Sequence, residues 1–237
     1  MINEKELKWY ENNMTENTPN YIQACCLVES IRPFMIDPIL YDNMNRDIFE
    51  MQEINKNFVS VIKEFYSKQV CNSIGIWGPC WKSFCKQLSE YIGDKKVLEV
   101  GCGNGLLALG LEYYDTKIIP TNENPNKFDF NTSNIKINNR IEYLEAKEAI
   151  KKYKDEVDYV LISWPPYEKP MLEEVFNLCN RYKLKLIYIG EEEYGCNGSE
   201  SFWSMLDRHG YYLKQIQSVE FYPFASMHDM AWTIEKD

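Results

Sequence analysis

The stretch KVLEVGCGNG, residues 96–105, decides the fold of this chain. Its apolar part, Val97 to Val100, is short and uninterrupted, which is typical of a strand buried in a parallel sheet. Glycines follow at alternate positions, 101, 103 and 105, and Leu106 to Tyr114 then has the pattern of a helix. A strand that turns through glycines into a helix indicates an α/β fold with a doubly wound sheet.

Strand and helix patterns alternate from this unit to the end of the chain. The further predicted strands are 117–121, 140–144, 158–163, 185–189, 211–217 and 231–235, and the helices are 146–153, 171–182 and 199–208. Right-handed crossovers make such a sheet mostly parallel. The last two strands have no helix pattern between them. We therefore expect a seven-stranded sheet that ends in an antiparallel edge hairpin.

Residues 1–90 show helical periodicity and no strand pattern. Helices are predicted at 21–31 and 82–92, and Asp47 and Glu50 have the spacing of a capping box. An apolar stripe follows that box, at Ile48, Met51, Ile54, Phe58, Ile62 and Phe65. We expect a helical N-terminal extension over 1–90 that closes over the carboxyl edge of the sheet, and an α/β domain over 91–237.

Composition limits the partners of the chain. It has 237 residues and a formal net charge of −10, which repels phosphate backbones and disfavours broad binding to nucleic acid, although a local basic groove stays open. The first residues carry acids where a signal peptide is apolar, and no apolar run approaches the ~18 residues of a membrane span. We expect a cytoplasmic protein that does not act at a membrane.

The eight cysteines contain no Cys-x-x-Cys pair, and only His209 and His228 can add imidazole ligands. We therefore expect reduced thiols and no metal site.

The glycines between the first strand and its helix allow a ligand to approach the backbone without interference from a Cβ atom, and the helix start offers unpaired N–H groups. This favours a nucleotide-like ligand. A dinucleotide fingerprint needs glycine at position 106, where this chain has Leu106, so the spacing disfavours NAD.

The stretch KVLEVGCGNG resembles motif I of class I S-adenosylmethionine-dependent methyltransferases, and the resemblance covers residues 95–237. It implies a Rossmann-like methyltransferase fold and S-adenosyl-L-methionine as the cofactor. The loop of Gly101, Cys102, Gly103 and Gly105 would lie under the methionine part. Glu99 would anchor the loop or the ammonium group.

The same resemblance implies polar contacts farther along the chain. Asn122 or Glu123, after the second strand, would bind the ribose hydroxyls, and Glu145 would face the adenine amino group. For Glu145, the start of a solvated helix is an equal alternative.

A second motif, SWPPY at 163–167, ends the fourth strand. Its prolines fix the backbone and leave carbonyls free to accept from a substrate N–H, while Tyr167 can stack on a flat group. It resembles the Asn/Asp-Pro-Pro-Tyr motif of amino-group methyltransferases, with Trp164 in place of the amide or carboxylate. It also resembles a little-characterised methyltransferase-like group with a Ser/Cys-Trp-Pro-Pro core.

That resemblance implies that Trp164, Pro165 and Tyr167 serve the acceptor side and that Ser163 lies at the cofactor. A plug at the sheet edge is the alternative. Two further acidic positions stand out. Glu191 to Glu193 either face the substrate or form a solvated acidic loop, and we favour the loop. His228 or Asp229 is a candidate general base, and the favoured alternative is that His228 is an ordinary surface histidine.

The function expected from these features is methyl transfer from S-adenosyl-L-methionine to a small-molecule or peptide acceptor. Two alternatives stay open, a nucleic-acid amino methyltransferase and a non-catalytic, cofactor-binding partner subunit. The oligomeric state and the identity of the acceptor are beyond the sequence.

Overall fold

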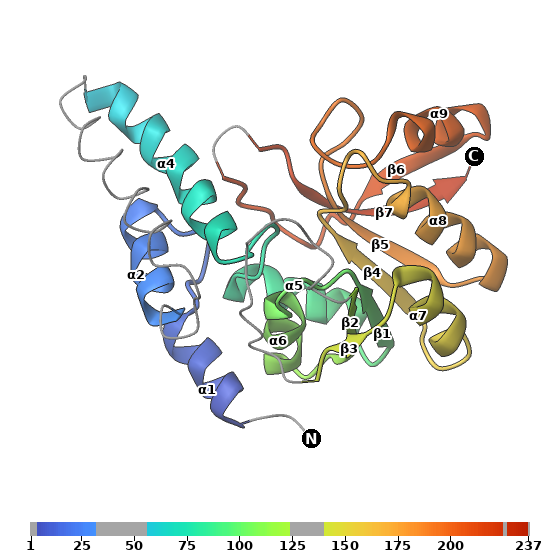
Figure 1. The fold of residues 1–237 in the computed structure, drawn as a ribbon, viewed down its shortest axis with the longest axis horizontal. Helices are drawn as coiled ribbons and strands as arrows, with labels where there is room; N and C mark the ends of the chain where they lie inside the picture. Colours follow the sequence, from blue (N-terminus) through green and yellow to red (C-terminus); the bar gives the residue numbers. More distant parts are fainter. Residues whose placement is uncertain (1–3, 32–55, 124–139, 225–226, 237) are drawn as a thin grey trace.

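The computed structural model describes residues 4–31, 56–123, 140–224 and 227–236, and one mixed sheet runs through its centre (Figure 1). The strands are β1 (Lys96–Val100), β2 (Lys117–Asn122), β3 (Glu142–Tyr143), β4 (Tyr159–Ser163), β5 (Lys185–Gly190), β6 (Tyr211–Gln215) and β7 (Met230–Lys236). Their order is β3-β2-β1-β4-β5-β7-β6. The strands from β3 to β5 are parallel, and β7 is antiparallel to both β5 and β6.

The predicted fold class, a doubly wound and mostly parallel seven-stranded sheet with an antiparallel edge hairpin, is confirmed. Two strands are at least two residues shorter than predicted, and the strand expected at 211–217 ends at Gln215. The expected strand at 140–144 is reduced to β3, because its ladder pairs only with Thr121 and Asn122 at the very end of β2.

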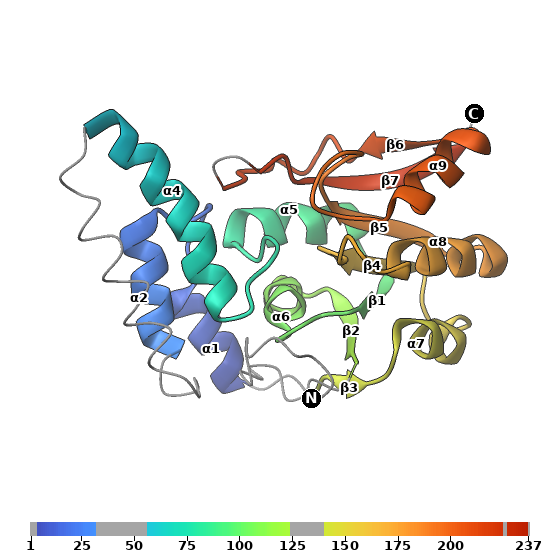
Figure 2. The ribbon, with the colours of Figure 1, turned by 45° about the horizontal axis from the view of Figure 1, so that its top comes forward.

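Helices cover both faces of this sheet (Figure 2). On one face lie α5 (Lys82–Ile92) and α6 (Leu106–Tyr113), and on the other α7 (Ala146–Tyr153), α8 (Met171–Tyr182) and α9 (Glu200–Arg208). Because side chains alternate along a strand, Val97 belongs to the core under α5 and α6, whereas Leu98 and Val100 belong to the core under α7, α8 and α9. Glu99 therefore faces the α5 and α6 side.

Three N-terminal helices lie beyond α6, on the left of Figure 1. They are α1 (Glu4–Asn13), α2 (Tyr21–Ile31) and α4 (Lys56–Ser73), with α1 against α6 and α2 against α4. Tyr10 is fully buried, and its hydroxyl donates to the carbonyl of Cys80 at 2.7 Å. A Cβ atom at Gly110 would lie 2.6 Å from the Tyr10 oxygen. The glycine therefore makes room for α1 on α6.

The predicted capping box at Asp47 and Glu50 lies outside the described residues. In the apolar stripe that follows it, Phe65 is the one side chain that the structure describes. Phe65 is 43% exposed, so the prediction that it packs into a buried face is wrong. The interior of this part of the chain is made instead by residues one turn farther on, such as Val70 and Cys71.

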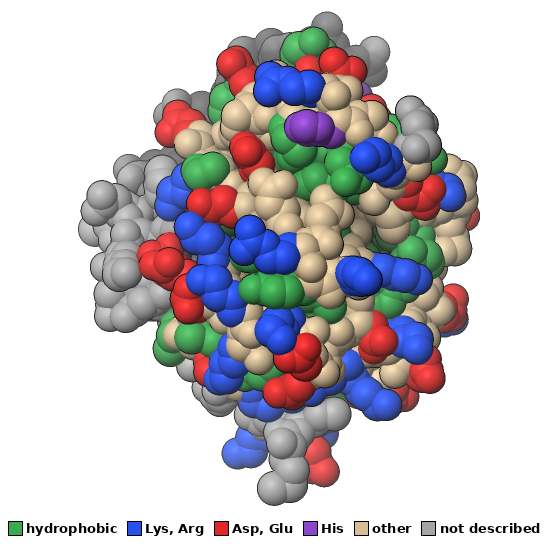
Figure 3. Space-filling view, turned by 90° about the vertical axis from the view of Figure 1, so that its right-hand side faces the viewer, with side chains coloured by type: hydrophobic (Ala, Val, Ile, Leu, Met, Phe, Trp, Pro, Cys, Tyr) green, Lys and Arg blue, Asp and Glu red, His purple; other side chains and the backbone are tan. Residues whose placement is uncertain are grey.

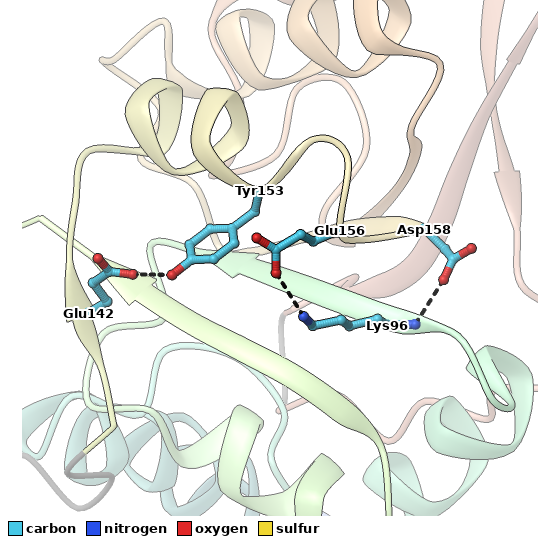
Figure 4. Close-up of polar contacts among 5 residues, drawn as sticks. All are labelled: Lys96, Glu142, Tyr153, Glu156 and Asp158. Atoms are coloured by element: carbon cyan, nitrogen blue, oxygen red, sulfur yellow. Dashed lines mark hydrogen bonds and ion pairs between the residues drawn. The ribbon is translucent and has the colours of Figure 1, made fainter.

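Charges at the amino ends of the strands are exposed and paired (Figure 4). The Lys96 ammonium lies 3.2 Å from Glu156, while the Lys96 backbone N–H donates to Asp158 at 3.0 Å. Glu142, which is level with the carboxyl end of β2, accepts from the Tyr153 hydroxyl. On this side of the molecule, Lys and Arg side chains are spread among acidic ones (Figure 3).

Every helix in the described part of the chain is too short or too polar to cross a membrane. The described residues also hold no cluster of three or more His, Cys, Asp or Glu side chains suited to a metal ion. All eight cysteines are free thiols.

Candidate functional site

The carboxyl ends of β1, β4 and β5 meet the amino end of the antiparallel β7 at one edge of the sheet, which brings the two sequence motifs together. Val100 pairs with Ile162, so the glycine loop and the SWPPY segment leave the sheet side by side. Gly190 pairs with Met230 on the next strands, which places Glu191 and Asp229 at the same edge. This is the edge where open α/β sheets bind their ligands.

The glycine loop adopts a backbone that side chains disfavour. Gly101, Gly103 and Gly105 have φ values of +70°, +57° and +81°. The Cys102 N–H donates to the Thr121 carbonyl at 3.0 Å, which ties the loop to the end of β2. A Cβ atom at Gly103 would meet nothing nearer than the Gly75 carbonyl oxygen at 3.9 Å. A Cβ atom at Gly101 would lie 2.8 Å from the end of the Met171 side chain, so Gly103 is the part of the loop that presents bare backbone in front of the first turn of α6.

Glu99 is the second-last residue of β1, directly before this loop, and is 1% exposed. Its backbone carbonyl accepts from the Thr121 hydroxyl at 2.8 Å, but within the described residues its side-chain Oε2 has no hydrogen-bond partner. Burial raises the pKa of this carboxyl to about 8. A buried carboxylate without a partner is costly, and a bound cation would remove that cost.

Asn104 is a residue of this loop that sequence reasoning missed. Its side-chain amide donates to the Ile74 carbonyl at 2.9 Å, and its Oδ1 accepts from the Leu106 N–H at 3.2 Å. The same side chain therefore caps the start of α6 and joins the loop to the segment that follows α4. An asparagine side chain that accepts from the N–H two residues on is a common local turn, but its second partner is 30 residues away in the sequence.

The predicted ribose and adenine residues reach the same edge. Asn122 and Glu123 are half-buried at the end of β2, and the Asn122 carbonyl accepts from the Leu144 N–H at 3.0 Å. Glu145 is exposed directly before α7 and does not cap that helix with its side chain. The structure brings these three residues to one side of the glycine loop, and their roles in binding stay predictions.

In the SWPPY segment the polar groups are already used within the chain. The Pro165 carbonyl accepts from the Asn197 amide at 3.1 Å, so one of its two acceptor sites is occupied and the prediction of a wholly free carbonyl is wrong. The sequence could not show this, because Asn197 follows the next strand. The Ser163 hydroxyl lies against the backbone of Gly78, where a Cβ atom would be 2.4 Å from it. Tyr167 is 42% exposed, with its hydroxyl 3.4 Å from Glu200.

Trp164 is the centre of a buried polar cluster. It has a φ of +53°, unusual for a bulky residue, and its indole N–H donates to the Asp229 carboxylate at 2.8 Å. The ammonium of Lys68, from α4, lies 3.9 Å from the centroid of the indole ring. Lys68 also donates to the Trp77 carbonyl. The N-terminal helices are in this way connected to the carboxyl edge.

Ionisation in this cluster departs from ordinary values. Burial raises the pKa of Asp229 to about 6, although the Lys68 charge opposes this shift. Burial lowers the pKa of Lys68, against the attraction of Asp229. Burial also opposes ionisation of Glu191, but hydrogen bonds from the His228 and Cys196 N–H groups outweigh it and lower the pKa of Glu191.

Glu191 is buried, so the expectation of a solvated acidic loop is wrong for this residue and holds only for Glu192 and Glu193, which are exposed. His228 is exposed, as an ordinary surface histidine is, whereas Asp229 is 2% exposed. Trp81 is a core residue packed edge-on against Phe224, with ring centroids 5.9 Å apart.

Neither a protein-family model nor a curated protein matches the sequence. Solved structures resemble the fold at low identity. A putative caffeoyl-CoA O-methyltransferase from Staphylococcus aureus has 14% identity and a TM-score of 0.43, and the alignment covers 81% of this chain and 99% of that one. A mutant of MtNAS in complex with S-adenosylmethionine has 12% identity and a TM-score of 0.41, covering 98% and 87% of the two chains.

The tRNA (uracil-54, C5)-methyltransferase of Pyrococcus abyssi, in complex with S-adenosyl-L-homocysteine, has 17% identity and a TM-score of 0.41. That alignment covers 64% of this chain and 37% of the Pyrococcus chain, so this chain spans well under half of that protein. Similarity this weak leaves the chemistry of the site to be worked out from its own residues.

Proposed function

We propose that this chain is a methyltransferase that binds S-adenosyl-L-methionine at the carboxyl edge of its sheet and methylates a small-molecule or peptide acceptor. The observation that carries the proposal is the pairing of a bare glycine loop with the orphaned Glu99 carboxyl beneath it. The loop suits a ligand that lies against backbone, and the carboxyl suits a ligand with an ammonium group.

The residues present fit this cofactor on both counts. Glu99 would hold the ammonium of the methionine part, with Gly103 allowing that part to lie against the loop. Asn122, Glu123 and Glu145 would bind the nucleoside. When bound, the cofactor supplies a methyl group on a sulfonium, which is already a strong electrophile. The work left to the chain is to align the acceptor and to exclude water.

The contacts of the SWPPY segment bear on the choice of acceptor. An amino-group methyltransferase of the type that the motif resembles grips the acceptor nitrogen with a side-chain oxygen and a free carbonyl. Here Trp164 provides no oxygen, and the Pro165 carbonyl already accepts from Asn197. This disfavours methylation of a nucleobase amino group, as does the net charge of −10.

The same contacts favour a second candidate, a subunit that binds the cofactor and does not catalyse transfer by itself. In that case the chain would bind S-adenosyl-L-methionine and methylate acceptors only after a partner is added. A screen of metabolites and peptides with a methyl-labelled donor, with and without cell extract, separates the two candidates. Label transferred by the purified chain alone supports the enzyme.

Binding itself is tested by calorimetry with S-adenosyl-L-methionine, S-adenosyl-L-homocysteine and NAD. The proposal predicts binding of the first two and none of NAD. Binding of NAD alone, or of none of the three, would contradict it. Gly103→Val fills the open space over the glycine loop and should abolish the binding. Gly93→Val is its matched control, because Gly93 has a φ of +64° and open space around it but lies before β1, at the other edge of the sheet.

A further inference from the structure

Lys68 is a buried cation that the glycine loop and the proposed cofactor site leave unexplained. It is 1% exposed, on the last third of α4, and its ammonium donates to the Trp77 carbonyl. Two rings flank the ammonium, with centroids 3.9 Å away in Trp164 and 5.2 Å away in Phe224. No ion pair between described residues includes Lys68. Its charge is thus held by a carbonyl and by ring faces, with carboxylates farther off.

Trp164 lies between that cation and a buried anion. The ammonium of Lys68 approaches the face of the indole, and the carboxylate of Asp229 accepts from its N–H at 2.8 Å. The two contacts come from different parts of the chain, α4 and the residue before β7, and act on different sides of one ring. They fix a side chain whose backbone, at a φ of +53°, is in a region that bulky residues avoid.

A purely structural plug at this position would be made more cheaply with apolar side chains. Burying a lysine and an aspartate carries a desolvation cost that well-packed apolar residues avoid. Their presence on both sides of Trp164 indicates a requirement for one orientation of the indole at the end of β4. Ring and cation together also join the N-terminal helices to the sheet.

We propose that Lys68 and Asp229 are positioning residues that hold Trp164 from its face and its edge, and so fix the SWPPY segment and dock α4 on the carboxyl edge. Any role of this cluster in methyl transfer rests on the proposed function. The geometry of the cluster is independent of that function, and it can be tested without cofactor or acceptor.

The indole N–H of Trp164 reports on the cluster by nuclear magnetic resonance in the full chain. Its resonance is identified by its loss in Trp164→Phe. As the pH is lowered from 8 to 5, we expect it to shift with a midpoint near the pKa of Asp229, about 6. The other titratable groups that act on Asp229 are Lys68, Glu191, His228, Tyr188 and Cys196.

Lys68→Met removes the cation that favours the ionised carboxylate, so the midpoint should rise by about one pH unit. Lys68→Arg keeps the charge and should leave the midpoint within a few tenths of a unit. Asp229→Asn should abolish the shift. Lys96→Met, which removes an exposed lysine at the other edge, is the matched control and should change nothing.

An unchanged midpoint in folded Lys68→Met would overturn the proposal, and so would a titration that persists in Asp229→Asn. If Lys68→Met does not fold, the Asp229→Asn result and the agreement of Lys68→Arg with the unaltered chain decide the matter. Calorimetry with S-adenosyl-L-methionine on the unaltered chain tests the proposed function separately. Absence of binding there would remove the function and leave the Trp164 cluster standing.

Discussion

At the amino edge of the sheet, Lys96 lies beside Glu156 and Lys95 beside Asp158, all of them exposed to solvent to a considerable degree. At the carboxyl edge, Lys68, Glu99 and Asp229 are almost fully buried, and none of them belongs to an ion pair of the described residues. The same sheet thus has solvated, paired charges at one end and buried ionisable groups outside any ion pair of the described residues at the other.

The two arrangements differ in cost. An exposed ion pair contributes about 0 to 1 kcal/mol and costs little to lose, whereas an ionised group buried without a partner costs several kcal/mol. At Glu99 a raised pKa of about 8 keeps the carboxyl protonated at pH 7, so the cost of a buried charge arises there only when the group ionises. The contrast indicates that the carboxyl edge is built for a charged ligand and the amino edge for solubility.

The largest effect is expected from Gly103→Val. At φ +57° a branched side chain is strained by about 1 to 2 kcal/mol, and it fills the space over the loop. We expect S-adenosyl-L-methionine binding to weaken about 100-fold or more, measured by calorimetry. Gly93→Val also places a branched side chain at a positive φ, but at the amino edge, and the folded variant should bind normally. Equal binding by the two variants would erase the contrast between the edges.

Glu99→Gln should change stability with a definite dependence on pH. The pKa of Glu99 is raised from 4.5 to about 8, so between these values the folded chain holds a proton that the unfolded chain has lost. Stability from this group is therefore present at low pH and declines as the pH rises through about 8. Glutamine avoids that decline.

Thermal unfolding at pH 5 and pH 9 checks this. Glu99→Gln should be close to the unaltered chain at pH 5 and exceed it by roughly 4 kcal/mol at pH 9. Glu156→Gln at the amino edge should show no such dependence. A Glu99→Gln chain that loses stability equally at both pH values would mean that the carboxyl has a partner in the folded state.

Asn104→Asp sharpens the comparison because it replaces only the side-chain amide nitrogen with an oxygen. The new carboxylate still accepts from the Leu106 N–H but faces the Ile74 carbonyl without a proton to donate. We expect a loss of about 1 to 2 kcal/mol in the free energy of unfolding, measured with urea. A change below about 0.3 kcal/mol would show that the loop is not tied to the segment after α4.

The smallest effect belongs to Lys96→Met. It removes the exposed pair with Glu156 and should cost less than about 1 kcal/mol, with the difference shrinking further in high salt. A double-mutant cycle with Glu156→Gln measures the pair. A coupling as large as that expected at the carboxyl edge would contradict the contrast drawn above.

The sequence was enough for the sheet and for the glycine loop, because both depend on local patterns. The apolar run from Val97 to Val100 and the glycines after it form a local pattern. The segment between the last two strands has no helical spacing of apolar residues, which predicted that no helix separates them. The antiparallel edge followed from that alone. Glu99 was found from its place at the strand end, although its lack of a partner was not.

What the sequence could not supply was the pairing of distant polar groups. Lys68 lies on a helix with no motif, and nothing local relates it to Trp164, 96 residues later, or to Asp229. The carbonyl of Pro165 was expected to be free because the amide of Asn197, which follows the next strand, carries no signal toward it. Contacts across the sheet edge depend on tertiary structure, and local patterns do not encode them.

The most direct test of the account is calorimetry of S-adenosyl-L-methionine at pH 7 in two buffers of different ionisation enthalpy. Free Glu99 holds a proton at this pH. When an ammonium ligand binds beside it, the carboxyl should ionise, so binding should release about one proton to the buffer. Glu99→Gln should bind about 10- to 100-fold more weakly and release none. Binding without proton release, or with the same release in Glu99→Gln, would contradict the placement of the cofactor over Glu99.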